Sequence, residues 1–236
     1  MRMKTRWIGA AILAVGVALA GLFVSSGIKE IAARDRVVSV RGLAEKEVKA
    51  NHVVWPITYK TTGNDLQGIY AEVNATNAKI VKFLKDNGLT ATDISLNSPE
   101  IEDLQTDRWP DKSKIKDRYN VKSTVTVASD KVDIVRQLVN RMGELLKVGV
   151  AIPPADYGEG IKYEYTELNK IKPEMIKSAT IDARAAAQKF ADDSESELGK
   201  IKEATQGYFE IEDRDEYTPY IKTVRVVTNV VFFLKS

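Results

Sequence analysis

The side chains that could perform acid–base or metal chemistry are few in this chain of 236 residues. It has no cysteine and a single histidine, His52, which excludes a thiolate nucleophile, a cysteine zinc site and an iron–sulfur cluster. The histidine stands at the start of an expected strand, and the sequence fixes no serine or carboxylate beside it. We interpret it as a partly exposed strand residue rather than a general base or a metal ligand. We therefore expect no catalytic residue and no zinc.

Two acidic segments, residues 192–197 and 210–216, present carboxylate oxygens of the kind that calcium binds. Neither has the spacing and central glycine of an EF-hand loop, and Arg214 interrupts the second. The segment Gly158-Glu159-Gly160 lacks the third glycine of a dinucleotide fingerprint, and the chain contains no GxxxxGKS or GxxxxGKT motif. We therefore expect solvated loops, with no bound metal and no nucleotide or other cofactor.

Aromatic residues gather toward the end of the chain, and they provide the candidate surface that the sequence offers. Tyr217, Tyr220, Phe232 and Phe233 could form a contact between subunits, or a groove for a small molecule, a peptide or a glycan. Packing in the core is the ordinary alternative for such residues. We take these four residues as the candidate oligomer or ligand surface.

The N-terminal segment predicts a membrane anchor. A basic cluster in residues 1–6 precedes an uncharged stretch over residues 7–28, whose apolar core begins at Ile8 and ends at Val24. As a helix this stretch would be about 30 Å long, which matches the hydrocarbon core of a bilayer. Cleavage is the alternative, because Ala18-Leu19-Ala20 matches the pattern of a signal-peptide site.

The orientation of the chain follows from its charges. The positive-inside rule keeps the basic flank in the cytoplasm, so residues 29–35 form a juxtamembrane link and residues 36–236 an extracytoplasmic domain. Without Arg2, Lys4 and Arg6, the 35 Lys and Arg fall to 32, against 33 Asp and Glu. The body thus has no basic excess for nucleic acid, and we expect no nucleic-acid partner.

Alternation of apolar and polar residues predicts several strands in the body. They are expected at residues 37–40, 48–60, 94–96, 119–127, 161–165, 201–211 and 221–234. Residues 99–116 are polar and are expected to form a long hairpin excursion. The last strand is apolar on both faces, so we expect it at the centre of a sheet or beneath a partner.

Three amphipathic helices are expected to pack on these strands. Asn64 is expected to cap the first, which Gly88 ends. Asp130 is expected to cap the second, which Gly149 ends. Pro173 is expected in the first turn of the third, whose small alanines indicate close packing on a sheet. The apolar stripe of the first helix comprises Leu66, Ile69, Tyr70, Val73, Ile80 and Leu84. The fold class is α+β: antiparallel sheets with three amphipathic helices packed on them, preceded by one N-terminal transmembrane helix.

Several segments together resemble the SIMPL-domain family of bacterial periplasmic and envelope proteins. These segments are residues 37–42, 83–88, 168–176, 179–194, 206–215 and 224–227, and the likeness covers about residues 36–234. It implies a periplasmic or membrane-tethered α+β protein without assigned catalysis. It also implies envelope and oxidative-stress roles, and large homo-oligomers in some members. The excursion over residues 103–117, with Trp109-Pro110, does not match the family pattern.

These observations together predict a non-enzymatic protein of the bacterial inner membrane, with one membrane pass and its domain in the periplasm. The two-sided apolar final strand indicates that this domain self-associates as a homo-oligomer. The alternative is a periplasmic module that binds a ligand, a peptide or a glycan near the C-terminal aromatics. An enzyme that uses carboxylates alone is the third hypothesis.

Overall fold

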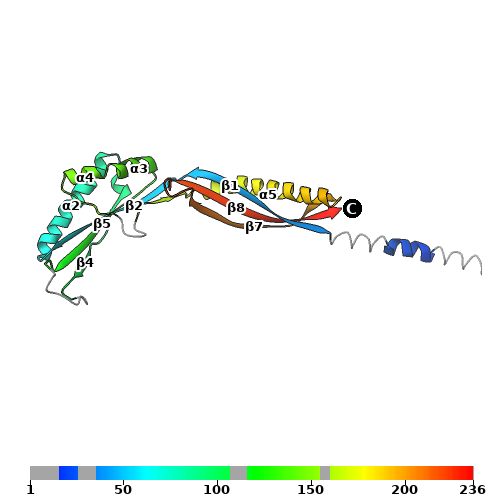
Figure 1. Ribbon diagram of the computed structural model, residues 1–236, viewed down its shortest axis with the longest axis horizontal. Helices are drawn as coiled ribbons and strands as arrows, with labels where there is room; N and C mark the ends of the chain where they lie inside the picture. The colour runs from blue at the N-terminus through cyan, green and yellow to red at the C-terminus, as the bar shows by residue number, and fades with distance from the viewer. Residues whose placement is uncertain (1–15, 26–35, 107–115, 155–159, 236) are drawn as a thin grey trace, which may run out of the picture. The chain divides into compact units, whose positions relative to one another are not determined.

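The computed structural model describes residues 16–25, 36–106, 116–154 and 160–235 (Figure 1). The chain separates into two units. Unit 1 comprises Met1–Lys46, Asn169–Glu210 and Val224–Ser236, and unit 2 comprises Glu47–Leu168 and Ile211–Thr223. Each unit contains the greater part of one sheet with helices beside it, which confirms the α+β class with antiparallel sheets.

The sheet of unit 2 has five strands in the order β3-β5-β2-β6, with β4 also paired to β5. Its strands are β2 (His52–Gly63), β3 (Ile94–Leu96), β4 (Glu100–Asp103), β5 (Tyr119–Ser129) and β6 (Lys162–Glu164). The long strands β2 and β5 are antiparallel, with Ile57 opposite Val125. Both of these residues are fully buried and belong to the core, while the residues that alternate with them are partly exposed.

The described residues of unit 2 form three α-helices: α2 (Leu66–Asp86), α3 (Val132–Asn140) and α4 (Gly143–Lys147). We expected one helix where α3 and α4 lie, and that prediction was wrong. The break falls just before Gly143, a residue that disfavours a continuous helix. Gly149, with φ of 78°, follows the end of α4 as expected.

The predicted N-caps of these helices were also wrong, because the expected residues form tertiary hydrogen bonds instead. Asp65 caps α2, since its carboxylate accepts hydrogen bonds from the backbone N–H groups of Gln67 and Gly68. Asn64 instead accepts a hydrogen bond from the N–H of Arg118 at 2.9 Å. Asp130 lies 2.7 Å from His52 and caps no helix, because Lys131 occupies the N-cap of α3.

The predicted stripe of α2 was too wide. Leu66 and Tyr70 are 42% and 66% exposed, whereas Ile69, Val73, Ile80 and Leu84 are buried. Asn77 completes the buried stripe, because its Oδ1 accepts a hydrogen bond from the Tyr59 hydroxyl at 2.9 Å. Asn77 is thus a buried polar residue with a hydrogen-bond partner, and a search for apolar residues alone does not identify its position as buried.

Unit 1 holds most of a three-stranded sheet in the order β1-β8-β7 and the helix α5 (Figure 1). The elements are β1 (Val37–Lys49), α5 (Leu168–Asp193), β7 (Glu197–Asp213) and β8 (Ile221–Lys235). The final strand is central in this sheet, which confirms that expectation. The first strand extends nine residues beyond the segment expected for it.

Helix α5 begins at Leu168, so Pro173 lies inside the helix and not in its first turn. Because proline lacks the N–H that would complete one helical hydrogen bond, we did not expect the helix to begin several residues before Pro173. Lys172 Nζ lies 5.7 Å from the centre of the Phe209 ring.

The expected membrane helix over residues 7–28 lies largely outside the described residues. Residues 16–25 within it are helical. None of the helices formed by the described residues has the length and apolar character that crossing a bilayer requires. Residues 107–115 of the polar excursion lie outside the described residues as well. The strands before and after them, β4 and β5, pair with each other.

Candidate functional site

The two faces of strand β8 differ in what covers them. Val224, Val226, Val230 and Phe232 alternate along one face and are at most 1% exposed. Two of them, Val230 and Phe232, form a cluster with Val40 of β1 and two alanines of α5. This face is therefore the one on which α5 packs.

The contact between α5 and β1 depends on a glycine. A Cβ atom placed on Gly42 would lie 1.9 Å from the backbone oxygen of Ala179 and 2.8 Å from the Cβ of Ala183. Both alanines are fully buried. The helix backbone thus approaches the strand more closely than any side chain at residue 42 would permit.

The opposite face of this sheet is apolar in part. On β8 it carries Val227, Val231 and Phe233, which are half-buried, and on β1 it carries Val37 and Leu43, which are 38% and 40% exposed. We call these five residues the open face. In the described part of the chain, no helix covers it.

Two contacts fix how β1 and β8 align on the open face. The N–H of Leu234 donates to the oxygen of Arg36 at 2.8 Å, and Arg225 Nε lies 3.4 Å from Glu45 Oε1. Counting inward from these contacts places Val37 opposite Phe233 and Leu43 opposite Val227. The apolar side chains of the two strands therefore lie side by side.

The two edges of this sheet are protected to different degrees. Along β1, Asp182 of α5 accepts a hydrogen bond from the N–H of Leu43 at 2.9 Å, and Glu174 of α5 pairs with Lys46 at 2.8 Å. Strand β7 forms the other edge over 17 residues, most of them exposed, and its Tyr208 is 96% exposed. Among the described residues no strand pairs with the outer edge of β7. An unpaired edge of this length is a template for another strand.

The four aromatic residues proposed from the sequence do not form one cluster. Phe232 and Phe233 belong to unit 1 and point to opposite faces of β8. Phe232 is fully buried toward α5, so it belongs to the core and not to a surface, which corrects that part of the prediction. Phe233 lies on the open face, where Lys202 Nζ is 5.7 Å from its ring centre.

The two tyrosines of the prediction belong to unit 2. Tyr217 is 87% exposed in the turn between β7 and β8. Tyr220 packs against the core of unit 2, with the Arg136 guanidinium 4.4 Å from its ring centre and the Tyr163 ring 6.2 Å away, edge to face. Phe233 and Tyr217 are therefore the two predicted residues that offer surface to a partner.

The acidic segment over residues 210–216 stabilises a turn. Asp215 accepts hydrogen bonds from the hydroxyl and the N–H of Thr218, and it pairs with Arg214 at 3.0 Å. The Thr218 hydroxyl and the Arg214 guanidinium lower the pKa of Asp215 to about 2. Throughout the described ranges, no group of three or more His, Asp or Glu side chains is arranged to hold a metal ion.

His52 is partly exposed at the first position of β2, with a side chain 27% exposed. Its Nδ1 lies 2.7 Å from Asp130 Oδ1, a partner that the sequence did not indicate. A carboxylate can orient an imidazole in this way, but acid–base catalysis also needs a reacting group within reach of the other ring nitrogen. Asp130 is the partner that the described residues give this imidazole.

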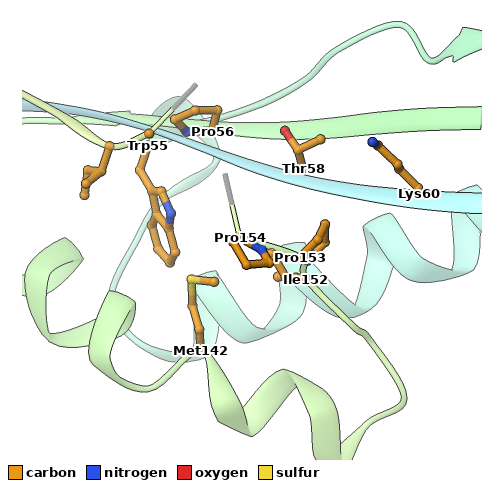
Figure 2. A pocket seen from close by; sticks show the side chains of 10 residues that line it. Trp55, Pro56, Thr58, Lys60, Met142, Ile152, Pro153 and Pro154 are labelled. Atoms are coloured by element: carbon orange, nitrogen blue, oxygen red, sulfur yellow. The ribbon is translucent and has the colours of Figure 1, made fainter. Parts of the chain in front are cut away.

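A small cavity lies at the edge of β2 in unit 2 (Figure 2). Trp55 and Met142 point toward it from opposite sides, and Ile152, Pro153 and Pro154 form another wall. Its volume is about 150 Å³, below the roughly 300–1,000 Å³ of typical ligand pockets. It is therefore a weaker candidate than the open face.

Two features of this structure were missed in the sequence, although each carried a signal. Gly42 interrupts an alternating strand, and a glycine inside a strand often marks the close approach of another backbone. Thr90 and Asp93 have the spacing of a capping box, which the structure contains at the short helix η1 (Ala91–Asp93).

Comparison with known families gives one match over most of the chain. Residues 38–232 match the family described as SIMPL, a protein of unknown function (DUF541), and the chain belongs to that family. No curated protein matches the chain. The match spans both units, and its description assigns no activity to the family.

Proposed function

We propose that this SIMPL-domain protein is a non-enzymatic envelope protein whose periplasmic domain self-associates through unit 1. The observation that carries the proposal is the open face, where apolar side chains of β1 and β8 lie side by side without a covering helix in the described part of the chain. Covering apolar surface favours association by about 25 cal/mol per Å². Exposed apolar residues on an uncovered sheet face are a feature of interaction sites.

A second copy of the chain is the partner that fits this surface. The unpaired edge of β7 adjoins the same sheet, so a strand from another copy could extend it with backbone hydrogen bonds. The β1 edge is less available for this, because Asp182 already accepts a hydrogen bond from the N–H of Leu43. The resemblance to a family with homo-oligomeric members supports the same choice.

The proposal includes a membrane tether at the N-terminus. It is supported by the uncharged residues 7–28 and by the basic residues before them, which favour a single pass with the domain in the periplasm. A cleaved signal would give the same compartment without the tether. A role in envelope or oxidative stress rests on the family likeness alone.

The oligomeric state of the full chain tests the self-association. In detergent, light scattering across a concentration series should give a discrete multiple of the monomer mass. Leu43→Lys places a charge on the open face and should raise the concentration needed for assembly by about tenfold or more. The matched control is Ile181→Lys on α5, an apolar residue that is 59% exposed and lies on another layer; it should assemble like the wild type.

Two results would contradict this proposal. One is a wild-type chain that remains a monomer at every concentration. The other is an oligomer that Leu43→Lys and Ile181→Lys affect equally, because the open face would then have no special part in assembly. Far-UV circular dichroism of both variants shows whether either substitution disturbs the fold.

A further inference from the structure

Strand β7 forms one edge of the unit 1 sheet, with β8 between it and β1 (Figure 1). In the described part of the chain, its outer backbone groups pair with no strand. Most of its side chains are exposed, and it contains no proline that would interrupt pairing. Such a strand can add another by backbone hydrogen bonds, and the side chains then decide which strand fits.

Two contacts show which side chains of β7 share a face. Lys202 Nζ lies 5.7 Å from the ring centre of Phe233, which belongs to the open face. Phe209 lies next to Lys172 of α5, so it is on the opposite face. Regular alternation from Lys202 to Glu210 agrees with both contacts, and it places the even-numbered residues of this stretch on the side of the open face.

The regular stretch begins at Lys202 because the alternation breaks before it. Leu198 packs on the cluster that α5 covers, although strict alternation would place it on the same face as Lys202. Gly199 lies between these two residues, and a glycine inside a strand often marks a bulge. The pairing of β7 with another strand is therefore compared over residues 202–210.

Opposite charges lie at the two ends of this stretch. Lys202 begins it and Glu210 ends it, with Gln206 midway between them. Neither Lys202 nor Glu210 forms an ion pair with another described residue. When a strand pairs with an antiparallel copy of itself, residues equidistant from the centre lie opposite each other. A centre at Gln206 therefore places Lys202 of each copy opposite Glu210 of the other.

Other centres lose this complementarity. A two-fold axis perpendicular to the sheet keeps each face on its own side, so it must lie between one residue and the same residue of the other copy. An axis at Glu203 would place two glutamates opposite each other. An axis at Thr205 would pair Glu210 with Lys200, which lies where the alternation breaks. An axis at Gly207 would leave Glu210 opposite an alanine.

We propose that β7 pairs antiparallel with β7 of a second copy of the chain, about a two-fold axis at Gln206. This inference rests on the proposed self-association of unit 1 and specifies one of its contacts. Tyr208, which is 96% exposed, then lies opposite Ala204 of the other copy, whose small side chain leaves room for the ring. The two three-stranded sheets join into one, and their open faces lie on the same side of it.

Disulfide crosslinking locates the axis, because the chain has no cysteine of its own. Single cysteines are introduced along residues 202–210 of the full chain, which is oxidised mildly in detergent. On the axis a residue lies opposite its own copy, with the Cα atoms about 4.5–5.5 Å apart, which a disulfide can bridge. Gln206→Cys should therefore form a covalent dimer. Ala204→Cys is the matched control: its two copies lie about 14 Å apart along the strands, and the yield should be about tenfold lower.

Charge reversal tests the register independently. Lys202→Glu and Glu210→Lys each place like charges opposite each other at both ends of the pair, and each should raise the concentration needed for assembly about tenfold in light scattering. An equal mixture of the two variants restores opposite charges at both ends and should assemble like the wild type. Glu203→Lys is the control, because Glu203 lies opposite the uncharged Phe209 in this register. Circular dichroism checks that all variants are folded.

Three results would overturn this inference and leave the proposed self-association in place. An assembled chain in which Gln206→Cys forms no covalent dimer would exclude this axis. A maximum of crosslinking at another residue would assign a different register. A mixture of Lys202→Glu and Glu210→Lys that assembles no better than either variant alone would show that these charges do not face each other. A wild-type chain that stays a monomer at every concentration would instead contradict the proposed function and this inference together.

Discussion

Units 1 and 2 pack helices on sheets in opposite ways. In unit 1 the helix contributes small residues: Ala179, Ala183 and Ala187 are fully buried, Gly42 of β1 meets the first two, and Val230 and Phe232 of β8 pack in the same layer. In unit 2 the largest fully buried side chains include Ile57, Ile80, Leu84, Leu138 and Leu145. Where α5 crosses Gly42, backbone contact sets the spacing of the layers in unit 1, whereas large side chains set it in unit 2.

This difference in packing predicts which substitutions each unit should tolerate. A close-packed contact between backbones has no space for an added methyl group, and overpacking forces the layers apart. A core filled by large side chains instead loses dispersion contacts and leaves a cavity when one of them is shortened. Enlargement should therefore damage unit 1, and truncation should damage unit 2.

The largest effect is expected from truncation in unit 2. Leu84→Ala removes a fully buried side chain of α2 and should lower the free energy of unfolding by about 2–5 kcal/mol. Leu66→Ala is the control on the same helix, because that leucine is 42% exposed and should cost well under half as much. Urea unfolding followed by tryptophan fluorescence, to which the buried Trp55 of unit 2 contributes, measures both. Equal costs for the two variants would contradict the account of this core.

Enlargement in unit 1 should have the next largest effect. Gly42→Ala puts a Cβ atom 1.9 Å from the oxygen of Ala179, so α5 must move away from β1, at a cost of about 1–3 kcal/mol. Amide hydrogen exchange should become faster in α5. Gly143→Ala is the control, since a Cβ there meets no atom within 4 Å. An unchanged exchange rate in α5 after Gly42→Ala would show that the contact is looser than described.

The sequence predicted the elements whose signals are local. Alternation along β5 and the apolar run of β8 were enough to identify both strands, and the alanines of α5 indicated its close packing. Caps and breaks were less predictable. Asn64 and Asp65 are both good capping residues, and the choice between them depends on Arg118, which is 54 residues away in the chain.

The candidate surface was predictable only in part, for a related reason. Phe232 and Phe233 are adjacent in a strand, so they must point to opposite faces. Both are apolar, and their types do not reveal which one faces α5. That information comes from the pairing of β8 with strands and a helix far away in the sequence, which no local pattern contains.

Lowering the pH should have the smallest effect on stability, and that effect should be selective for unit 2. Unit 2 contains carboxyl groups whose pKa lies below its usual range. Asp93 is the most buried of them. Burial alone would raise its pKa, but hydrogen bonds from Thr90 and Lys131 outweigh that effect and lower the pKa. The other groups are Asp103, Asp133, Glu144 and Asp215.

The sign of the effect follows from these lowered pKa values. A carboxyl group with a lower pKa in the folded state stabilises it fully above its unfolded pKa, near 4. That stabilisation is lost as the pH falls below this value. From pH 7 to pH 3, amide exchange in β3, β5 and α3, corrected for the intrinsic rate, should therefore accelerate more than exchange in α5.

Asp93→Asn isolates one contribution to this acid sensitivity. At pH 7 it should cost on the order of 1 kcal/mol, because the charge-assisted hydrogen bonds from Thr90 and Lys131 are lost. The difference between the variant and the wild type should shrink as the pH falls, since acid protonates the wild-type carboxylate. Asp182→Asn in unit 1 is the control and should leave the acid response of unit 2 unchanged. If the difference in free energy of unfolding between Asp93→Asn and the wild type stayed constant down to pH 3, the negative charge of Asp93 would not contribute to stability. The greater acid sensitivity expected of unit 2 would then not come from this carboxylate.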